Sequence, residues 1–205
     1  MALIVVTGAS RGIGAALVSA FAARGDHVLG LSRETLDVCS ADSIAGARAR
    51  VSEPIDILIN NAGMTGGPQR APGMDLARAA QILDVNAMGP LRVYDAFADL
   101  LRKGRGLLVN ISSEAGSLGA FRASSKPEYA MSKAALNALT LWIAARDPEV
   151  FPISLHPGWT KTETGGADAP DTAEQTATKI LTALDALTPD HRGGFFDTSL
   201  QRIPW

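Results

Sequence analysis

Two side chains that could exchange a proton with a substrate stand four residues apart in the second half of the chain. Tyr129 and Lys133 belong to an apolar segment with helical spacing, so they share one face of the predicted helix. An isolated tyrosine hydroxyl has a pKa of about 10, and a nearby ammonium group favours the phenolate and lowers that pKa. The pair could therefore act as a general acid or base, although two neighbouring surface residues would show the same spacing.

A glycine-rich turn near the N-terminus has the composition of a phosphate-binding loop. It follows the apolar run at residues 2–6 and precedes residues with helical spacing. Glycine permits a tight turn and a close approach of a pyrophosphate to the main chain, and a helix N-terminus offers N–H groups to an anion. The spacing G-x-x-x-G-x-G departs from G-x-G-x-x-G, and a helix that merely begins with glycines would look alike. The predicted dinucleotide contacts in the turn are Gly8, Ser10, Arg11, Gly12, Ile13 and Gly14.

The end of the next predicted strand, Leu31-Ser32-Arg33, bears on which dinucleotide would bind. Folds that prefer NAD usually place Asp or Glu at this point, bonded to the ribose hydroxyl. Ser32 and Arg33 would instead accept the 2′-phosphate of NADPH, and Arg11 could approach it from the glycine turn. We therefore predict NADPH as the preferred cofactor, with NADH possible. Glu34 follows directly and weakens the argument for NADPH slightly. Alternatively, both arginines are ordinary solvated side chains.

Strands and helices alternate along the sequence. This alternation indicates parallel βαβ units, and hence an α/β fold with one doubly wound parallel sheet (a Rossmann fold) and helices on both faces. We expect a single NAD(P)-binding domain over residues 1–205, with its ligand crevice at the carboxyl ends of the strands. Strands are predicted at 2–6, 27–32, 55–60, 106–111, 153–156 and 193–197, with a further short strand at 36–38. Helices are predicted at 15–22, 77–101, 129–146 and 173–187, and the second is interrupted at Gly89-Pro90.

Composition excludes several classes of protein. The 19 basic and 21 acidic residues give a net charge of −2, which argues against a nucleic-acid partner or an anionic membrane surface. One cysteine, Cys39, allows neither an internal disulfide nor a thiolate-rich metal site, and the three histidines lack metal-ligand spacing. We predict no metal. Without a signal-peptide pattern or an apolar span near twenty residues, we expect a cytoplasmic protein.

The motifs occur in an order that resembles the short-chain dehydrogenase/reductase family, over roughly residues 1 to 165. The ending Gly193-Gly194-Phe195-Phe196-Asp197 and Ile203-Pro204-Trp205 is similar to the C-factor-like, or sniffer-like, carbonyl reductase branch. The loop at 121–128 is longer than the family usually shows. The motifs that carry the resemblance are Thr7-Gly8-x-x-x-Gly12-x-Gly14, Asn60-Asn61-Ala62-Gly63, Asn86, Ser113-x-x-Gly116, Tyr129-x-x-x-Lys133 and Pro157-Gly158-x-x-x-Thr162.

The resemblance implies that Asn86, Ser113, Tyr129 and Lys133 are catalytic. Tyr129 would be the general acid in carbonyl reduction and the base in alcohol oxidation, and Ser113, rather than Ser112, would hold the carbonyl oxygen. Lys133 would also bond the nicotinamide ribose, and Asn86 would hold a water of the proton relay, unless it is simply a residue of the helix interruption. Further implied cofactor contacts are Tyr129, Asp37, Asn60, Ala62, Gly63, Pro157, Gly158, Thr160 and Thr162.

Two of these contacts have an alternative reading. Asp37 could accept from the adenine amine or merely form a turn. Thr160 stands where the family usually has an aliphatic residue, so we expect its contact to come from the backbone. Outside the motifs, we expect Arg48 and Arg50 to be solvated and His156 to be a hydrogen-bonded core residue.

The predicted function is an NADPH-dependent reductase that transfers hydride between nicotinamide and a small carbonyl or alcohol substrate. Two alternatives stay open: a dinucleotide-binding sensor with little or no turnover, and an NAD-dependent alcohol dehydrogenase with the same site. The chain could form a homodimer or homotetramer through the helices that contain Asn86 and Tyr129.

Overall fold

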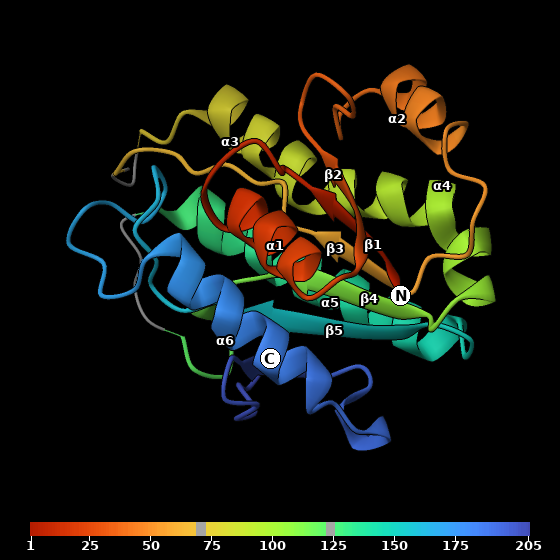
Figure 1. Cartoon of the computed structure of the whole chain (residues 1–205). Coiled ribbons are helices and arrows are strands. Elements are labelled where there is room, and N and C mark those ends of the chain that lie inside the picture. The colour runs from red at the N-terminus through yellow and green to blue at the C-terminus, as the bar shows by residue number, and fades with distance from the viewer. Residues whose placement is uncertain (69–72, 122–125) are drawn as a thin grey trace.

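A parallel sheet of six strands forms the centre of the computed structural model, which describes residues 1–68, 73–121 and 126–205 (Figure 1). The strand order is β2-β1-β3-β4-β5-β6, and every neighbouring pair is parallel. The predicted doubly wound α/β fold is confirmed. The strands are β1 (Leu3–Thr7), β2 (His27–Leu31), β3 (Ile57–Asn60), β4 (Leu107–Ile111), β5 (Phe151–His156) and β6 (Phe195–Asp197).

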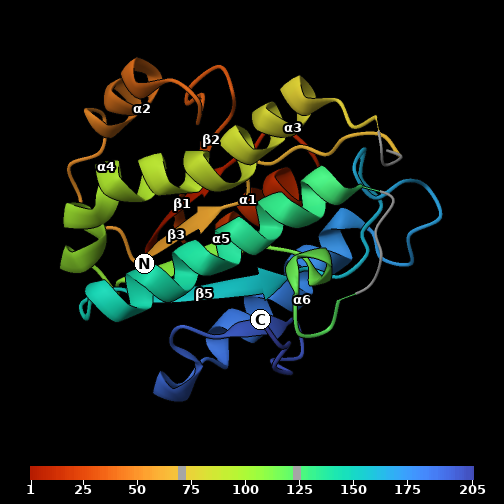
Figure 2. The ribbon, with the colours of Figure 1, turned by 180° about the vertical axis from the view of Figure 1, so that it is seen from behind.

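Helices cover both faces of this sheet. The helices α1 and α6 pack side by side on one face, and α4 and α5 lie on the other, as the front and rear views show (Figures 1 and 2). The α-helices are α1 (Gly12–Ala23), α2 (Ala41–Arg48), α3 (Leu76–Leu83), α4 (Gly89–Lys103), α5 (Pro127–Arg146) and α6 (Ala173–Asp185). Short turns of other helix types are η1 (Asp84–Met88), η2 (Glu114–Gly116) and η3 (Pro189–His191).

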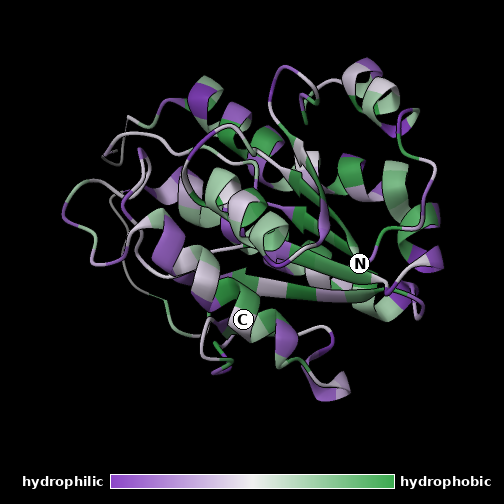
Figure 3. Ribbon diagram, viewed as in Figure 1, coloured by the Kyte–Doolittle hydropathy of each residue, from purple (hydrophilic) through white to green (hydrophobic). Residues whose placement is uncertain are grey.

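The strand residues divide between two apolar cores because side chains alternate across a sheet. Ile4 and Val6 join the core beneath α1 and α6, whereas Leu3 and Val5 join the core beneath α4. This explains why the run at the N-terminus is apolar at every position, since both faces of the strand are covered. Colouring by hydropathy shows mainly apolar strands, with polar residues on the connections and on parts of the helices (Figure 3).

The predicted interruption of the long second helix is a π-helical turn. The chain leaves α3, passes through η1 and continues as α4. The Gly89 N–H donates to Asp84 O, five residues back, and Pro90 has no N–H to donate. A side chain at Gly89 would come within 2.8 Å of Val38 Cγ2, so glycine lets α4 begin close to the segment after β2. The turn places Asn86 on the inside of the helix layer.

Two predictions about the segment after β2 are wrong. Residues 36–38 form no strand, because side chains of the segment bond its own backbone: Asp37 Oδ1 accepts from Cys39 N, and Ser43 Oγ accepts from Asp37 N. Leu36 and Val38 are nevertheless buried in the core. Arg48, predicted to be solvated, donates to Ala96 O at 3.0 Å and ties α2 to α4.

The strands all point their carboxyl ends toward one end of the molecule. The loop of residues 157–172 and the segment after β3 lie together at that end (Figures 1 and 2). The longer connection predicted at 121–128 falls partly on residues 122–125, outside the described residues. A search of the described helices for one able to span a membrane finds none.

Candidate active site

A cleft of about 1300 Å³ opens at the carboxyl ends of the strands. It is bounded by the glycine-rich turn after β1, by residues 61–65 after β3, and by the loop after β5. Because β2 and β3 lie on opposite sides of β1, the connections from neighbouring strands diverge here and leave a crevice. The cleft therefore lies where the ligand crevice was predicted, at the carboxyl ends of the strands.

The glycine turn adopts backbone conformations that other residues rarely take. Gly8 and Gly12 have φ angles of 67° and 56°. Gly14 acts differently, since a Cβ there would overlap the Gly8 carbonyl oxygen. Gly8, Ser10, Arg11, Gly12 and Ile13 line the cleft as predicted, whereas Gly14 is buried behind the turn and lets α1 pack against it.

The start of α1, like those of α4 and α5, lacks the side-chain cap that α2, α3 and α6 have. Ser40, Asp75 and Thr172 accept hydrogen bonds from the first turns of α2, α3 and α6. At the same position of α1, Arg11 makes no such bond. The first N–H groups of α1 therefore remain available at the cleft, where the helix dipole favours an anion.

The two predicted phosphate-binding arginines both line the cleft, and each has a carboxylate partner. Arg33 Nε lies 3.7 Å from Asp37 Oδ2, and Arg11 forms an ion pair with Glu163 of the loop after β5. Both arginine side chains are more than three-quarters exposed, so these pairs contribute little and can exchange for another anion. Ser32 is not among the cleft residues, and its N–H donates to Thr35 Oγ1.

Asn61, and not its neighbour Asn60, lines the cleft. Asn60 is buried at the end of β3 and its Nδ2 donates to Asn110 Oδ1 at 2.9 Å, so the prediction for its side chain is wrong. Asn61, which sequence analysis missed, lines the cleft and donates to Thr7 O and Gly8 O. It thereby fixes the glycine turn to the segment after β3. Ala62 and Gly63 line the cleft as predicted.

Three of the predicted catalytic side chains line the cleft where the end of β4 meets the start of α5: Ser113, Tyr129 and Lys133. The Ser113 side chain lies close enough to the Tyr129 hydroxyl to lower its pKa. Lys133 Nζ donates to Ile111 O at 2.7 Å and lies 5.6 Å from the centre of the Tyr129 ring. The arrangement joins the end of β4 to the first turns of α5, so a hydroxyl, a phenol and an ammonium group face one region.

Burial has the largest effect on the pKa values of Tyr129 and Lys133. It raises the pKa of Tyr129, and the neighbouring Ser113 side chain offsets part of that increase. It also lowers the pKa of Lys133 to about 8. In the chain alone the tyrosine pKa is therefore raised, and its lowering by the ammonium together with an oxidised nicotinamide stays a prediction for the cofactor-bound protein. The phenol is protonated at neutral pH and can give a proton away.

Asn86 lies behind this group, buried, and not among the cleft residues. Its Oδ1 accepts from Met64 N at 2.8 Å, and its Nδ2 donates to Met64 O and Ser132 Oγ. One acceptor position of the side-chain amide therefore remains. A side chain at Gly63 would come within 3.3 Å of Asn86 Oδ1 and 3.8 Å of Lys133 Nζ, so glycine leaves space between those two atoms.

The loop after β5 faces the glycine turn across the cleft. A Cβ at Gly12 would lie 3.2 Å from Thr162 Cγ2, and Pro157, Gly158, Thr160 and Thr162 all line the cleft as predicted. Thr160 is buried, and its Oγ1 lies 2.8 Å from Thr176 Oγ1 of α6. Its side chain therefore holds the loop, and its backbone is the part that a ligand could reach.

Several cleft residues were not predicted. His156 was expected to be a hydrogen-bonded core residue, but it lines the cleft, and its Nδ1 is buried without a partner among the described residues. Its place at the carboxyl end of a strand was the available signal. Glu114, Arg78, Met64 and Trp159 also line the cleft, and nothing in their spacing pointed to it.

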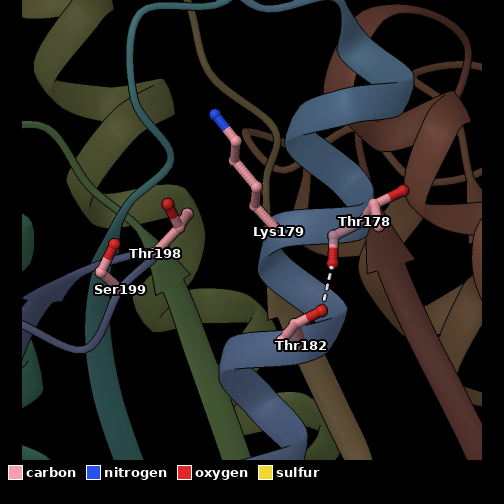
Figure 4. Close-up of a pocket in the computed structure, with 5 residues that line it drawn as sticks. All are labelled: Thr178, Lys179, Thr182, Thr198 and Ser199. Carbon is pink, nitrogen blue, oxygen red and sulfur yellow. Dashed lines mark hydrogen bonds between the residues drawn. The ribbon is translucent and has the colours of Figure 1, made fainter.

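A smaller pocket, of about 250 Å³, lies between α6 and the turn after β6 (Figure 4). Figure 4 shows that the Thr182 hydroxyl is bonded within its own helix, to Thr178 O. The Lys179 ammonium is paired with Asp171 Oδ2 at 2.7 Å. None of the predicted site residues lies there, and the described residues hold no His, Cys, Asp and Glu cluster suited to a metal. The large cleft is the candidate active site.

Comparison with known proteins gives concordant matches. The family model described as short chain dehydrogenase matches residues 35–173. C-signal of Myxococcus xanthus is 40% identical over 155 residues, which cover 74% of this chain and 93% of that protein. The carbonyl reductase Sniffer of D. melanogaster has a TM-score of 0.88 and 25% identity, covering 100% of this chain and 99% of that one. The NADPH-bound carbonyl reductase from chicken fatty liver also has a TM-score of 0.88 and 25% identity, with 100% of both chains covered.

Proposed function

We propose that this chain, which belongs to the short chain dehydrogenase family, is an NADPH-dependent reductase of small carbonyl compounds. Membership makes it an NAD(P)-dependent oxidoreductase, and the predicted resemblance, including its C-factor-like and sniffer-like branch, is confirmed. One observation carries the proposal beyond the family. Ser113, Tyr129 and Lys133 line the same cleft as two exposed arginines, Arg11 and Arg33, whose ion pairs can exchange for another anion.

The cleft offers suitable groups for each part of NADPH. Arg33 and Arg11 would take the 2′-phosphate, and the uncapped N–H groups at the start of α1 would take the pyrophosphate. Leu36 and Val38 supply an apolar surface for the adenine, beside the Asp37 carboxylate. At the far end, the proposed ribose and nicotinamide contacts are Lys133, Tyr129, Pro157, Gly158, Thr160 and Thr162. Bound NADPH supplies the hydride.

The side chains would supply and replace the proton. Ser113 would hold the substrate oxygen by a hydrogen bond, and Tyr129 would donate its proton to that oxygen as negative charge develops on it. The Lys133 ammonium would then stabilise the phenolate that Tyr129 becomes. A water between Asn86 Oδ1 and Lys133 Nζ, in the space left by Gly63, would provide the proton that restores the phenol. Oxidation of an alcohol would run through the same groups in reverse.

An assay with a panel of ketones and aldehydes, in which the consumption of NADPH measures turnover, tests this proposal. We expect reduction of several panel members, with NADPH preferred to NADH because Ser32 and Arg33 stand at the strand end where an NAD site would have a carboxylate. Tight NADPH binding without turnover of any carbonyl would instead favour a dinucleotide-binding sensor. A clear preference for NADH with alcohol oxidation would favour an alcohol dehydrogenase.

We further propose that residues 1–205 act as one domain, in the cytoplasm, within a homodimer or homotetramer. Cys39 is a free and exposed thiol, which suits a reducing compartment. On α5, the exposed Met131 and Trp142 are three helical turns apart on one face, and Met88 of η1 is also exposed. Such a surface on the helices beside Asn86 and Tyr129 supports contact with a second copy.

A further inference from the structure

His156 lies on the same side of the sheet as the proposed proton donor. In β5, Ser154 Oγ lies 2.8 Å from Thr140 Oγ1 of α5, so Ser154 faces the helix that carries Tyr129. Side chains alternate along a strand, and His156, two residues on, therefore faces that side too. Ile111 pairs with Leu155 in the register of β4 and β5, which brings Ser113 and His156 to adjoining strand ends. Both residues line the cleft.

The two nitrogens of the His156 ring have different surroundings. Nδ1 is buried and bonds none of the described residues, whereas Nε2, which also bonds none of them, is not among their buried atoms without a partner. A neutral imidazole carries one N–H, and a buried N–H without an acceptor costs more than a buried acceptor without a donor. The proton is therefore placed on Nε2. Burial lowers the pKa of His156 by more than the negative charges of Glu114 and Asp197 raise it, so the ring is neutral at neutral pH.

From this geometry we propose that His156 is a substrate-positioning residue whose Nε2–H donates to a second oxygen of the substrate. The preferred substrates would be carbonyl compounds with a neutral acceptor oxygen beside the reacting carbonyl, such as vicinal diketones and oxo-esters. Ser113 and Tyr129 hold the first oxygen in the proposed function, on which this inference rests, and His156 holds the second.

The carboxylates around His156 narrow the substrate class further. Glu114 lines the cleft, and Asp197 is paired with His156 in the register of β5 and β6. Asp197 Oδ1 accepts from the N–H groups of Ser199 and Gln201, which hold the carboxylate at the end of β6. A substrate with its own carboxylate at this position would meet like charge. Oxo-acids should therefore be poorer substrates than the corresponding neutral oxo-esters.

A comparison of 2,3-butanedione with 2-butanone tests the role of His156. Replacement His156→Leu should lower kcat/KM for the diketone about tenfold, mainly through KM, while kcat/KM for the monoketone changes less than about threefold. His156→Gln should restore most of the diketone activity, because its side-chain N–H₂ reaches about the position of Nε2. NADPH titration and thermal unfolding confirm that each variant is folded. Equal losses for both ketones, or no rescue by Gln, would overturn the proposal.

A spectroscopic measurement separates this inference from the proposed function. In ¹⁵N-histidine-labelled protein saturated with NADP⁺, we expect the His156 proton on Nε2, and a shift of the Nε2 signal when the diketone is added. A proton on Nδ1, or a signal that the diketone leaves unchanged, would overturn the role of His156 even if ketones are reduced. If the wild-type protein reduced neither ketone, the proposed function would fail, and this measurement would still decide whether His156 binds the diketone.

Discussion

At the scale of single residues, burial moves both proposed proton-transfer groups toward their neutral forms. Tyr129 keeps its proton because its pKa is raised, and Lys133 holds its proton less firmly because its pKa is lowered to about 8. Below about pH 8 a protonated phenol thus stands beside an ammonium group, which is the state that carbonyl reduction requires. Above that pH the ammonium group is lost first, and with it the charge that would stabilise the phenolate.

The lowered pKa of Lys133 predicts how NADPH binding depends on pH. NADPH is an anion and favours the charged lysine, so above pH about 8 binding must take up a proton. The dissociation constant should then rise, by up to about tenfold per pH unit. Fluorescence titration across this range measures it. In Lys133→Met the bend near pH 8 should disappear, and a wild-type profile that is flat through this range would contradict the assignment.

Arg33 should determine the preference for NADPH. Replacement Arg33→Ala removes a guanidinium group proposed to bind the 2′-phosphate, so KM for NADPH should rise about tenfold while KM for NADH stays within about twofold. Arg105→Ala is a matched control, because Arg105 is exposed before β4, outside the residues that line the cleft. The proposal for Arg33 fails if KM for NADPH is unchanged, or if both cofactors are affected alike.

At the scale of elements, glycine has opposite effects in α1 and α2. A Cβ at Gly14 would overlap Gly8 O, whereas a Cβ at Gly46 in α2 would meet nothing within 4 Å. Gly14→Ala should therefore lower the free energy of unfolding by about 1–3 kcal/mol and weaken NADPH binding. Gly46→Ala should raise that free energy by about 0.5–1 kcal/mol and leave binding unchanged. Denaturant unfolding and NADPH titration measure both, and a stabilised Gly14→Ala would contradict the packing role.

The elements themselves were largely predictable, because their signals are local. The apolar runs gave the strands, and Gly89-Pro90 gave the interruption between α3 and α4. Residues 36–38 were mistaken for a strand because Leu36 and Val38 have the alternation of one. Here the backbone N–H groups bond the side chains of Asp37 and Ser43 instead of a neighbouring strand. The spacing of apolar residues does not show which of these partners the backbone takes.

At the scale of the whole molecule, the sequence predicts the site residues that belong to ordered motifs. It does not predict which way a side chain faces where contacts between distant segments determine this. Asn60 ends β3 and Asn61 follows it, and only the packing against Asn110 shows that Asn60 points inward. Arg48 looked solvated because its acceptors, Ala96 O and Asp99, belong to a helix far along the chain. The buried Nδ1 of His156 is likewise a product of several elements packing together, which spacing in the sequence cannot show.

The exposed apolar face of α5 predicts self-association. Trp142 is 54% exposed there, and Leu76, at the start of α3, is 75% exposed. Trp142→Glu should shift the mass measured by light scattering toward that of one chain, because a charge would be buried in the contact. Leu76→Glu, which also places a charge on an exposed apolar residue, should not shift it. A wild-type protein with the mass of one chain would contradict the proposed assembly.

The central claim is that Tyr129 gives a proton to the substrate while bound NADPH reduces it, and turnover of Tyr129→Phe tests that claim most directly. Tyr94, the other of the two tyrosines, serves as control because its hydroxyl bonds Asp147 away from the cleft. We predict that Tyr129→Phe lowers kcat by about 10²–10⁴-fold with NADPH affinity nearly unchanged, and that Tyr94→Phe keeps its turnover. Carbonyl reduction by Tyr129→Phe at the wild-type rate would contradict the account.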